Sequence, residues 1–362
     1  MRFTPEYVKD HTEEILEEIR RMDLGEVNLM EVCGTHTMEI AKAGIKRMLP
    51  ENIRLLSGPG CPVCVTPPEV IDEILKLSER KDLIITTYGD MVRVPGSRRG
   101  DNLAYRKALG SRVEIVYSPM DAVAIAQSHP EKEVVFLGVG FETTAPGTLI
   151  SVLEAKRLGL KNYSVLMMLK RVEPALRTLI HDPDFNVQGF LCPGHVAVII
   201  GEEGFRFLSE EFHIPAVISG FEPEDILLSV YELLLQIKEG KAVLENEYTR
   251  AVSADGNLMA LKVLEDSCDC EGSLWRGMGV IEESSYALKE EYALYDAAKR
   301  YHLTFTPKED KSGCRCGEVI QGKREPKSCP LFGTVCTPDD PFGPCMVSSE
   351  GSCAAAYKYQ EV

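Results

Sequence analysis

The 362-residue chain contains no apolar run that approaches the ~20 residues needed to cross a bilayer. Its longest apolar stretch, Ile226–Ile237, is interrupted by polar side chains. The first residues, MRFTPEY, lack the apolar core of a secretory signal. Basic residues are also few: 40 Lys and Arg stand against 56 Asp and Glu, a formal charge of −16. We therefore expect a cytoplasmic protein with neither a membrane nor a nucleic acid as partner, because nucleic-acid affinity depends on cationic contacts to phosphate.

Cysteine, by contrast, is abundant and clustered, with 12 residues. Two lie in the glycine-rich segment Gly58–Cys64, and six lie in the C-terminal segment Pro307–Cys353, called the tail below. In a chain without a secretory leader, such clusters indicate metal or redox chemistry and not a disulfide scaffold.

Between residues 27 and 240, short apolar runs alternate with amphipathic helical patterns. The predicted strands are Val27–Val32, Ile53–Ser57, Leu83–Thr87, Val113–Tyr117, Val134–Gly138, Ser164–Leu169, Gly189–Leu191 and Ala216–Ser219. This alternation predicts parallel sheets with crossover helices. The expected fold class is α/β: two parallel-sheet domains, residues 1–118 and 119–240, followed by a mostly helical and irregular domain, 241–362. Its best helical segments are Ala254–Glu265 and Tyr286–Arg300.

Four polar motifs directly follow predicted strands. They are Cys33-Gly34-Thr35-His36, Gly60-Cys61-Pro62-Val63-Cys64, Gly140-Phe141-Glu142-Thr143-Thr144 and Cys192-Pro193-Gly194-His195. Ligands of open parallel sheets bind outside the carboxyl ends of the strands. We therefore expect these motifs to line one cleft, between the two halves of the α/β region.

The tail holds only seven residues from Val, Ile, Leu and Phe, against six glycines and six prolines. It cannot bury enough apolar surface to offset an ordering cost of about 1–2 kcal/mol per residue, so we expect covalent or metal links. Four of its cysteines, Cys314, Cys329, Cys336 and Cys353, are separated by 14, 6 and 16 residues. Structural zinc favours tight Cys-x-x-Cys pairs, absent from the tail, and the spacing slightly favours an iron–sulfur cluster.

Two tail cysteines, Cys316 and Cys345, then remain over. Three roles stay open for them: a spare dithiol beside the cluster, a structural disulfide, or two thiols without a function.

Cys61 and Cys64 form a Cys-x-x-Cys pair before a helix that we expect to begin with a capping box at Thr66. A helix N-terminus favours the thiolate, so this pair suits dithiol–disulfide exchange or soft-metal binding. Half of a zinc site is the alternative.

Cys33 and His36 form a Cys-x-x-His pair that either binds one metal or places a base beside a thiol. A buried structural pair explains the spacing equally well. Three roles stay open for His195: a metal ligand, an acid–base group, or a structural histidine held by a hydrogen bond. Glu142 either orients a ligand or proton, or is incidental beside a helix capped by Thr143 or Thr144.

A small cationic loop contains Arg93, Arg98 and Arg99, which either attract an anion or partner or are solvated. Cys268 and Cys270 form no recognisable motif, and we assign them no role.

Taken together, several motifs resemble the HypD family of nickel–iron hydrogenase maturation proteins. They are Cys33-Gly34-Thr35-His36-Thr37, Gly58-Pro59-Gly60-Cys61-Pro62-Val63-Cys64, Gly140-Phe141-Glu142-Thr143-Thr144, Pro193-Gly194-His195-Val196 and Met346-Val347-Ser348-Ser349-Glu350-Gly351. The resemblance spans nearly the whole chain, in order, and shows no departure at the key cysteines.

The resemblance implies a scaffold for the Fe(CN)2CO unit of the hydrogenase, formed with a small HypC-type chaperone. Cyanide would come from a thiocyanate on a HypE-type donor, which works with a carbamoyl-transferring HypF-type protein. It also implies two α/β domains followed by a C-terminal [4Fe–4S] domain. The protein would be a redox-active assembly scaffold more than a conventional turnover enzyme.

Carried onto this chain, the resemblance makes Cys33 the thiolate that binds the iron of Fe(CN)2CO, shared with a chaperone cysteine, with His36 close by. Cys61 and Cys64 would be the redox dithiol. The ligands of the [4Fe–4S] cluster would be Cys314, Cys329, Cys336 and Cys353. Cys316 and Cys345 would form a second dithiol, an arrangement similar to ferredoxin:thioredoxin reductase.

The expected mechanism passes electrons from the cluster through the dithiols to ligands of an iron held at Cys33. Glu142 and His195 are further candidate catalytic residues. Two other functions stay open: a stand-alone, iron–sulfur-dependent thiol–disulfide oxidoreductase, and a zinc-stabilised interaction module.

Overall fold

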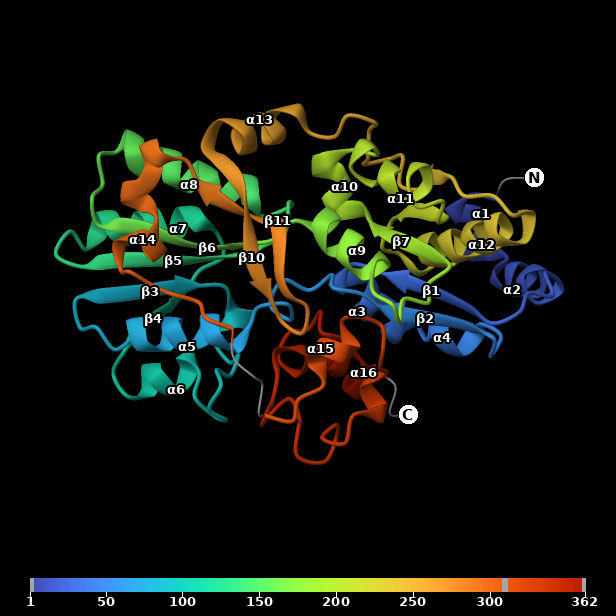
Figure 1. The fold of residues 1–362 in the computed structure, drawn as a ribbon, viewed down its shortest axis with the longest axis horizontal. Coiled ribbons are helices and arrows are strands. Elements are labelled where there is room, and N and C mark those ends of the chain that lie inside the picture. Colours follow the sequence, from blue (N-terminus) through green and yellow to red (C-terminus); the bar gives the residue numbers. More distant parts are fainter. Residues whose placement is uncertain (1–2, 308–311, 360–362) are drawn as a thin grey trace.

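A computed structural model describes residues 3–307 and 312–359 and contains two parallel sheets side by side (Figure 1). The first sheet consists of β1 (Val27–Glu31), β2 (Ile53–Ser57), β7 (Gly189–Pro193), β8 (Ala216–Ser219) and β9 (Leu244–Asn246). The second sheet consists of β3 (Leu83–Thr87), β4 (Arg112–Ile115), β5 (Glu133–Gly140) and β6 (Tyr163–Leu169). All eight predicted strands are present, so the α/β fold class is confirmed; β9 was not predicted.

The strands divide between the sheets differently from the expected split at residue 118. The first sheet has the order β2-β1-β7-β8-β9, and the second has the order β4-β3-β5-β6. The segment that carries β3–β6 is thus inserted between β2 and β7, and the chain crosses between the sheets twice. We call each sheet with its helices the first and the second lobe. The boundaries 1–118 and 119–240 do not describe these lobes, because a pattern of alternating elements does not tell which strands pair.

Helices cover both sheets, as crossover connections require. The first lobe carries α1 (Pro5–Asp10), α2 (Thr12–Arg21), α3 (Gly34–Ala43), α4 (Ile45–Met48), α10 (Gly194–Ile200), α11 (Arg206–Glu210) and α12 (Pro223–Glu239). The second carries α5 (Pro68–Leu77), α6 (Leu103–Ala108), α7 (Pro119–Ser128) and α8 (Ala145–Arg157), and α9 (Val172–Ile180) leads back to the first lobe. Within the described ranges, no helix is both long enough and apolar enough to cross a bilayer.

The region 241–306 is less helical than expected. After α13 (Leu258–Ser267), the strands β10 (Cys268–Trp275) and β11 (Gly279–Leu288) form an antiparallel hairpin that runs between the lobes (Figure 1). Gly277 and Gly279 adopt positive φ values of 75° and 74° at its turn, which favours glycine. Tyr286, expected to begin a helix, pairs with Cys270 in the hairpin. Helical turns follow only at Glu290–Tyr295 and in α14 (Ala297–Arg300).

The tail lies below the junction of the lobes in Figure 1 and contains α15 (Cys316–Val319) and the start of α16 (Ser352–Tyr359). One hydrophobic cluster joins all three parts. It includes Cys61 and Cys64, Leu137 and Phe190 from the two sheets, and Cys345 from the tail. Cys61, Cys64 and Cys345 therefore lie in the core that the lobes and the tail share.

Candidate metal and redox site

A cavity of about 180 Å³ lies where the strand ends of the two lobes meet. All four predicted motifs contribute to its lining, as the sequence pattern predicts. The lining residues from these motifs are Cys33, Thr35, Gly60, Pro62, Phe141, Thr143, Thr144, Pro193 and His195. Glu350, from the tail, completes the wall.

Cys33 is half-buried and precedes the first turn of α3. Its backbone N–H donates to the Glu31 carboxylate at 3.1 Å, and the Thr37 hydroxyl donates to the other oxygen of Glu31 at 2.5 Å. Gly60 packs against Cys33 so closely that a Cβ there would lie 2.3 Å from the Cys33 backbone nitrogen. Only glycine fits this contact, which holds the Cys61–Cys64 loop against Cys33.

The surroundings of Cys33 favour the uncharged forms of the Cys33 thiol and the Glu31 carboxyl group. Burial, with a contribution from the Glu350 charge, raises the pKa of Cys33 to about 12. Burial also raises the pKa of Glu31 to about 7, although its hydrogen bonds oppose the shift. The thiol of Cys33 therefore keeps its proton at neutral pH, and a metal ion would bind this sulfur only by displacing that proton.

His36 is fully buried beside this cavity, as the alternative of a structural pair requires. Its Nε2 lies 2.7 Å from the carbonyl oxygen of Gly220, so Nε2 carries the proton and donates. Its Nδ1 is buried without a hydrogen-bond partner among the described residues. Burial lowers the pKa of His36 to about 4, which keeps the imidazole neutral. A neutral imidazole with an unused lone pair is competent to accept a hydrogen bond or bind a metal.

Phe221 joins the two histidines. Its ring stacks on His36 with centroids 4.7 Å apart and on His195 with centroids 3.8 Å apart. His195 is exposed and faces the cavity, and its side chain makes no hydrogen bond to the described part of the chain. Its main contact is therefore aromatic stacking, not the hydrogen bond expected of a structural histidine.

Glu142 is buried but does not line the Cys33 cavity. One of its oxygens accepts the backbone N–H of Val172 at 2.8 Å, at the start of α9. Its other oxygen has no hydrogen-bond partner among the described residues, and burial raises the pKa of Glu142 to about 7. Thr144 takes the N-cap position of α8 without a side-chain hydrogen bond, so capping by that threonine is not observed.

Cys61 and Cys64 are buried and joined in a disulfide, with Cα atoms 5.2 Å apart. The expected capping box at Thr66 is absent: the Thr66 hydroxyl donates to the Pro62 carbonyl at 2.9 Å, and Pro67 takes the N-cap position of α5. The side chain of Thr66 thus fastens the dithiol loop instead of the helix.

The second expected dithiol lies beside the first. The Sγ atoms of Cys316 and Cys345 are 2.7 Å apart, and Cys316 Sγ lies 4.0 Å from the carbonyl oxygen of Cys64. Both tail cysteines are buried. Cys316 of the second pair therefore lies against the backbone of the first pair.

The four cysteines expected to hold a cluster gather in the tail. Burial raises the pKa of Cys353, and charges on Cys316, Cys314, Cys336 and Cys329 raise it further, so each of these four thiols lies within electrostatic reach of Cys353. The Cys336 sulfur accepts the backbone N–H of Phe342 at 3.4 Å.

The backbone around these sulfurs is also closely fitted. At Gly343, a Cβ would lie 2.5 Å from the Cys314 sulfur, so a side chain there would occupy the space beside this thiol.

The spacing of these sulfurs distinguishes between metals. Four thiolates on one zinc ion lie about 3.8 Å apart, given zinc–sulfur bonds of about 2.3 Å and tetrahedral geometry. Within the described ranges, no three cysteines bring their sulfurs within 4.8 Å of one another. A [4Fe–4S] cluster holds its thiolates farther apart because each binds a different iron. In this arrangement the four cysteines do not form the tight tetrahedral site of a single zinc ion.

The cationic loop holds the tail. Arg93 donates to the carbonyl of Pro338 at 2.5 Å, and Arg99 pairs with Asp340 and lies 4.2 Å from the ring centre of Phe342. Both arginines are also exposed, so this loop is solvated and at the same time contacts the tail.

Two further contacts fix the end of the tail at the cavity. Ser348 donates to Asp90 of the second lobe at 2.8 Å, and Thr35 of the first lobe donates to Glu350 at 3.0 Å.

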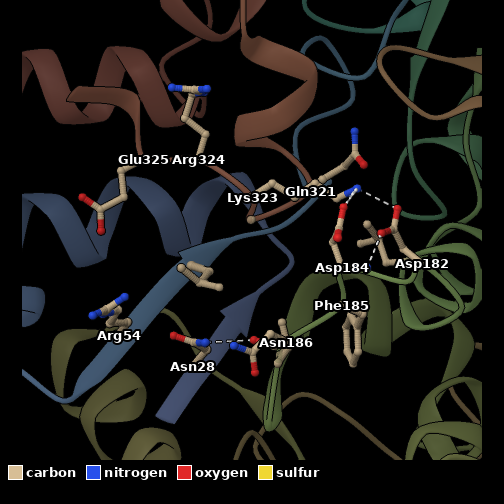
Figure 2. Close-up of a pocket in the computed structure, with 14 residues that line it drawn as sticks. Asn28, Arg54, Asp182, Asp184, Phe185, Asn186, Gln321, Lys323, Arg324 and Glu325 are labelled. Carbon is tan, nitrogen blue, oxygen red and sulfur yellow. Dashed lines mark hydrogen bonds and ion pairs between the residues drawn. The ribbon is translucent and has the colours of Figure 1, made fainter. Parts of the chain in front are cut away.

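A second cavity, of about 220 Å³, lies between β1, β2, the 182–187 loop and the tail (Figure 2). Lys323 of the tail points at Asp182 and Asp184, with nitrogen–oxygen distances of 2.7 and 3.8 Å. The Asn28 amide donates to the carbonyl of Asn186 at 2.9 Å. The cationic side chains that line this cavity form ion pairs within the protein. We therefore interpret the cavity as part of the contact surface between the tail and the first lobe.

Three residues of the site were not candidates from sequence: Glu31, Phe221 and Glu350. Glu31 accepts the backbone N–H of Cys33, and Glu350 accepts the hydroxyl of Thr35 in the helix that follows Cys33. The available signals were the position of Glu31 two residues before Cys33, the second Gly-Phe-Glu after a strand at Gly220–Glu222, and the place of Glu350 in a recognised motif. None of these signals reveals contact across the fold.

The fold and the site define a two-lobed α/β protein with two buried cysteine pairs and four further cysteines in its tail. Comparison with known proteins then gives the family. Residues 7–360 match the family model HypD, described as the hydrogenase formation hypA family. The chain belongs to this HypD family.

Several curated relatives are similar over almost their full length. Hydrogenase maturation factor HypD2 of Bradyrhizobium diazoefficiens is 44% identical, covering 91% of this chain and 88% of its own. Hydrogenase maturation factor HypD of Escherichia coli is 43% identical, covering 92% and 90%. Hydrogenase maturation factor HypD of Cupriavidus necator is 42% identical, covering 92% and 89%.

Proposed function

We propose that this protein acts in maturation of [NiFe] hydrogenase, as the scaffold on which the Fe(CN)2CO unit is assembled. Its partners would be a HypC-type chaperone and a HypE-type cyanide donor, and its location the cytoplasm. The observation that carries the proposal is the cavity at Cys33. There, one thiol, the dithiol loop, two histidine-bearing segments and the tail converge. The family membership and the names of the relatives support the same role.

Cys33 binds the iron that is the cargo of the site. Its proton leaves as the iron–sulfur bond forms, and a soft thiolate suits an iron whose other ligands are cyanide and carbon monoxide. Glu31 fixes the orientation of Cys33 through its backbone N–H. A chaperone cysteine completes the pair of thiolates.

Cys314, Cys329, Cys336 and Cys353 hold a [4Fe–4S] cluster, which supplies electrons when bound. The protein's own thiols carry out the next exchange. The dithiol of Cys316 and Cys345 attacks the Cys61–Cys64 disulfide; one S–S bond breaks and another forms, with two electrons and two protons transferred. The position of Cys316 against the Cys64 carbonyl supports this step.

The reduced Cys61–Cys64 pair then acts on a protein thiocyanate. A dithiol and R–S–CN yield the Cys61–Cys64 disulfide, R–SH and cyanide with one released proton, so atoms and electrons balance. His195 lies in the cavity, and His36 has a free Nδ1 beside it; both are placed to hydrogen-bond the incoming ligand. Glu142 holds the start of α9 behind the cavity and acts as a positioning residue.

The Cys33→Ala variant tests the anchor. We expect the infrared bands of iron-bound cyanide to disappear from the complex with the chaperone when it is purified anaerobically. Cys270→Ala, which removes an exposed thiol outside the site, is the matched control. Undiminished bands in Cys33→Ala would reject Cys33 as the iron ligand.

Metal analysis of the anaerobic protein separates the two alternatives. Iron with sulfide excludes the zinc-stabilised module, whereas one zinc in a colourless protein excludes both redox functions. Disulfide reductase turnover without any chaperone would favour the stand-alone oxidoreductase.

A further inference from the structure

A separate cavity of about 240 Å³ lies between the end of β6, the β10–β11 hairpin and the start of α5. It shares no lining residue with the Cys33 cavity. Its volume is below the roughly 300–1,000 Å³ of pockets for drug-sized ligands, so it suits a small molecule.

Lys170 forms the charged part of this cavity. It is the only buried lysine in the described part of the chain, at 5% exposure. Its Nζ donates to the Ser273 hydroxyl at 2.5 Å and to the Leu274 carbonyl at 3.0 Å. An ammonium group has three N–H donors, so one remains for a ligand.

Within the described ranges the ammonium group of Lys170 forms no ion pair. Burial lowers the pKa of Lys170 to about 7, although the more distant charge of Glu271 opposes the shift. Glu271, exposed at the rim, is the only acidic side chain among the lining residues. Burial of a charge without a counter-ion is unfavourable, so an anion in this cavity would be stabilised.

The rest of the lining is mostly apolar or already satisfied. Val70, Met168, Val280 and Phe305 provide apolar surface. The hydroxyl of Ser285, like that of Thr66, is used within the protein, donating to the Leu169 carbonyl at 2.6 Å. A ligand would therefore meet one cation and hydrocarbon walls, with Glu271 disfavouring a second negative charge.

We propose that this cavity binds a small monocarboxylate, with its carboxylate on Lys170 and its hydrocarbon part against Met168 and Phe305. The proposal does not depend on the role in hydrogenase maturation. Thr66 and Pro67, which line the cavity, follow closely after Cys64, so a bound ligand contacts the segment that carries the dithiol.

The test uses acetate as the probe and the uncharged isostere acetamide as its control, with binding to the full-length protein followed by calorimetry. We expect saturable acetate binding that acetamide does not reproduce. Lys170→Met should weaken acetate binding by about tenfold or more, the usual effect of losing a hydrogen bond to a charged group. Lys262→Met removes an exposed lysine and should leave binding unchanged.

A second variant keeps the test decisive if Lys170→Met does not fold. Val280 is 56% exposed at the cavity, and Val280→Trp should obstruct it without touching Lys170. Acetate binding should be lost in Val280→Trp and retained in Cys33→Ala, which separates this site from the proposed iron site. Absence of saturable acetate binding to the unmodified protein, or equal binding of acetamide, would overturn the proposal.

Discussion

The Cys33 cavity and the tail are built by different means. Cys33 is held by packed strand ends, by the Glu31 carboxylate and by the close contact with Gly60. The tail has few apolar side chains and depends on its cysteines and on contacts with both lobes. The difference teaches that packing of the lobes preforms the thiol site, whereas we expect the order of the tail to depend on a group held by its cysteines.

The largest expected effect therefore follows from removing one tail sulfur. Cys336→Ser should destroy cluster binding and make the tail at least about tenfold more sensitive to protease, because metal binding and local folding are coupled. The lobes should stay folded. Limited proteolysis with mass spectrometry measures both, with Cys270→Ser as the control. A tail that remains protected in the metal-free variant would contradict this contrast.

Gly60→Ala tests the preformed site. The added Cβ would overlap the Cys33 backbone, so we expect a loss of about 1–3 kcal/mol in the free energy of unfolding, as for other overpacked positions. Denaturant unfolding gives this value, and iron binding at Cys33 should fall with it. Gly147→Ala, in the exposed part of α8 with open space around it, should instead be neutral or slightly stabilising. Equal effects of the two substitutions would show that the contact at Gly60 is unimportant.

The buried His36 predicts a pH dependence of stability. Its folded pKa of about 4 lies below the ordinary value near 6.5, so in that interval the unfolded state binds a proton that the folded state does not. Stability is therefore lost as the pH falls from about 6.5 towards 4, by up to about 1.4 kcal/mol per pH unit.

In His36→Gln the slope over this interval should be smaller, while the amide can still donate to the Gly220 carbonyl. Urea unfolding at several pH values measures the slope. His181→Gln, at an exposed histidine, should keep the original slope. An unchanged slope in His36→Gln would mean that His36 is not the group responsible.

The smallest effect is expected at the surface contact of the tail. The Arg99–Asp340 pair is about half exposed, and such pairs contribute about 0–1 kcal/mol. Arg99→Ala should change protease sensitivity of the tail far less than Cys336→Ser does. A comparable loss of protection would show that ion pairs, and not cysteines, order the tail.

Local patterns predicted much of the fold. The eight strands follow from apolar periodicity, which acts over a few positions. The pairing of β1 with β7 joins segments about 160 residues apart, and no local pattern encodes it. The β10–β11 hairpin was missed for a related reason, because its partner strands stabilise each other and neither shows a strong strand pattern alone.

The candidate site was predictable to a similar extent. Strand-end motifs correctly indicated that Cys33, the dithiol loop and His195 meet at one cavity. Glu142 also follows a strand, yet its side chain turns away to Val172. Phe221 and Glu350 act through contacts with distant segments, which sequence spacing alone does not reveal.

The central claim is that electrons reach the Cys61–Cys64 disulfide from the tail pair, and a trapped intermediate tests it most directly. In Cys345→Ser, Cys316 can attack the disulfide but the mixed disulfide cannot be resolved by its usual partner. Mass spectrometry of the reduced-cluster protein should then find a peptide carrying Cys316 joined to one carrying Cys61 or Cys64. Absence of this cross-link, with the Cys61–Cys64 bond intact, would contradict the account.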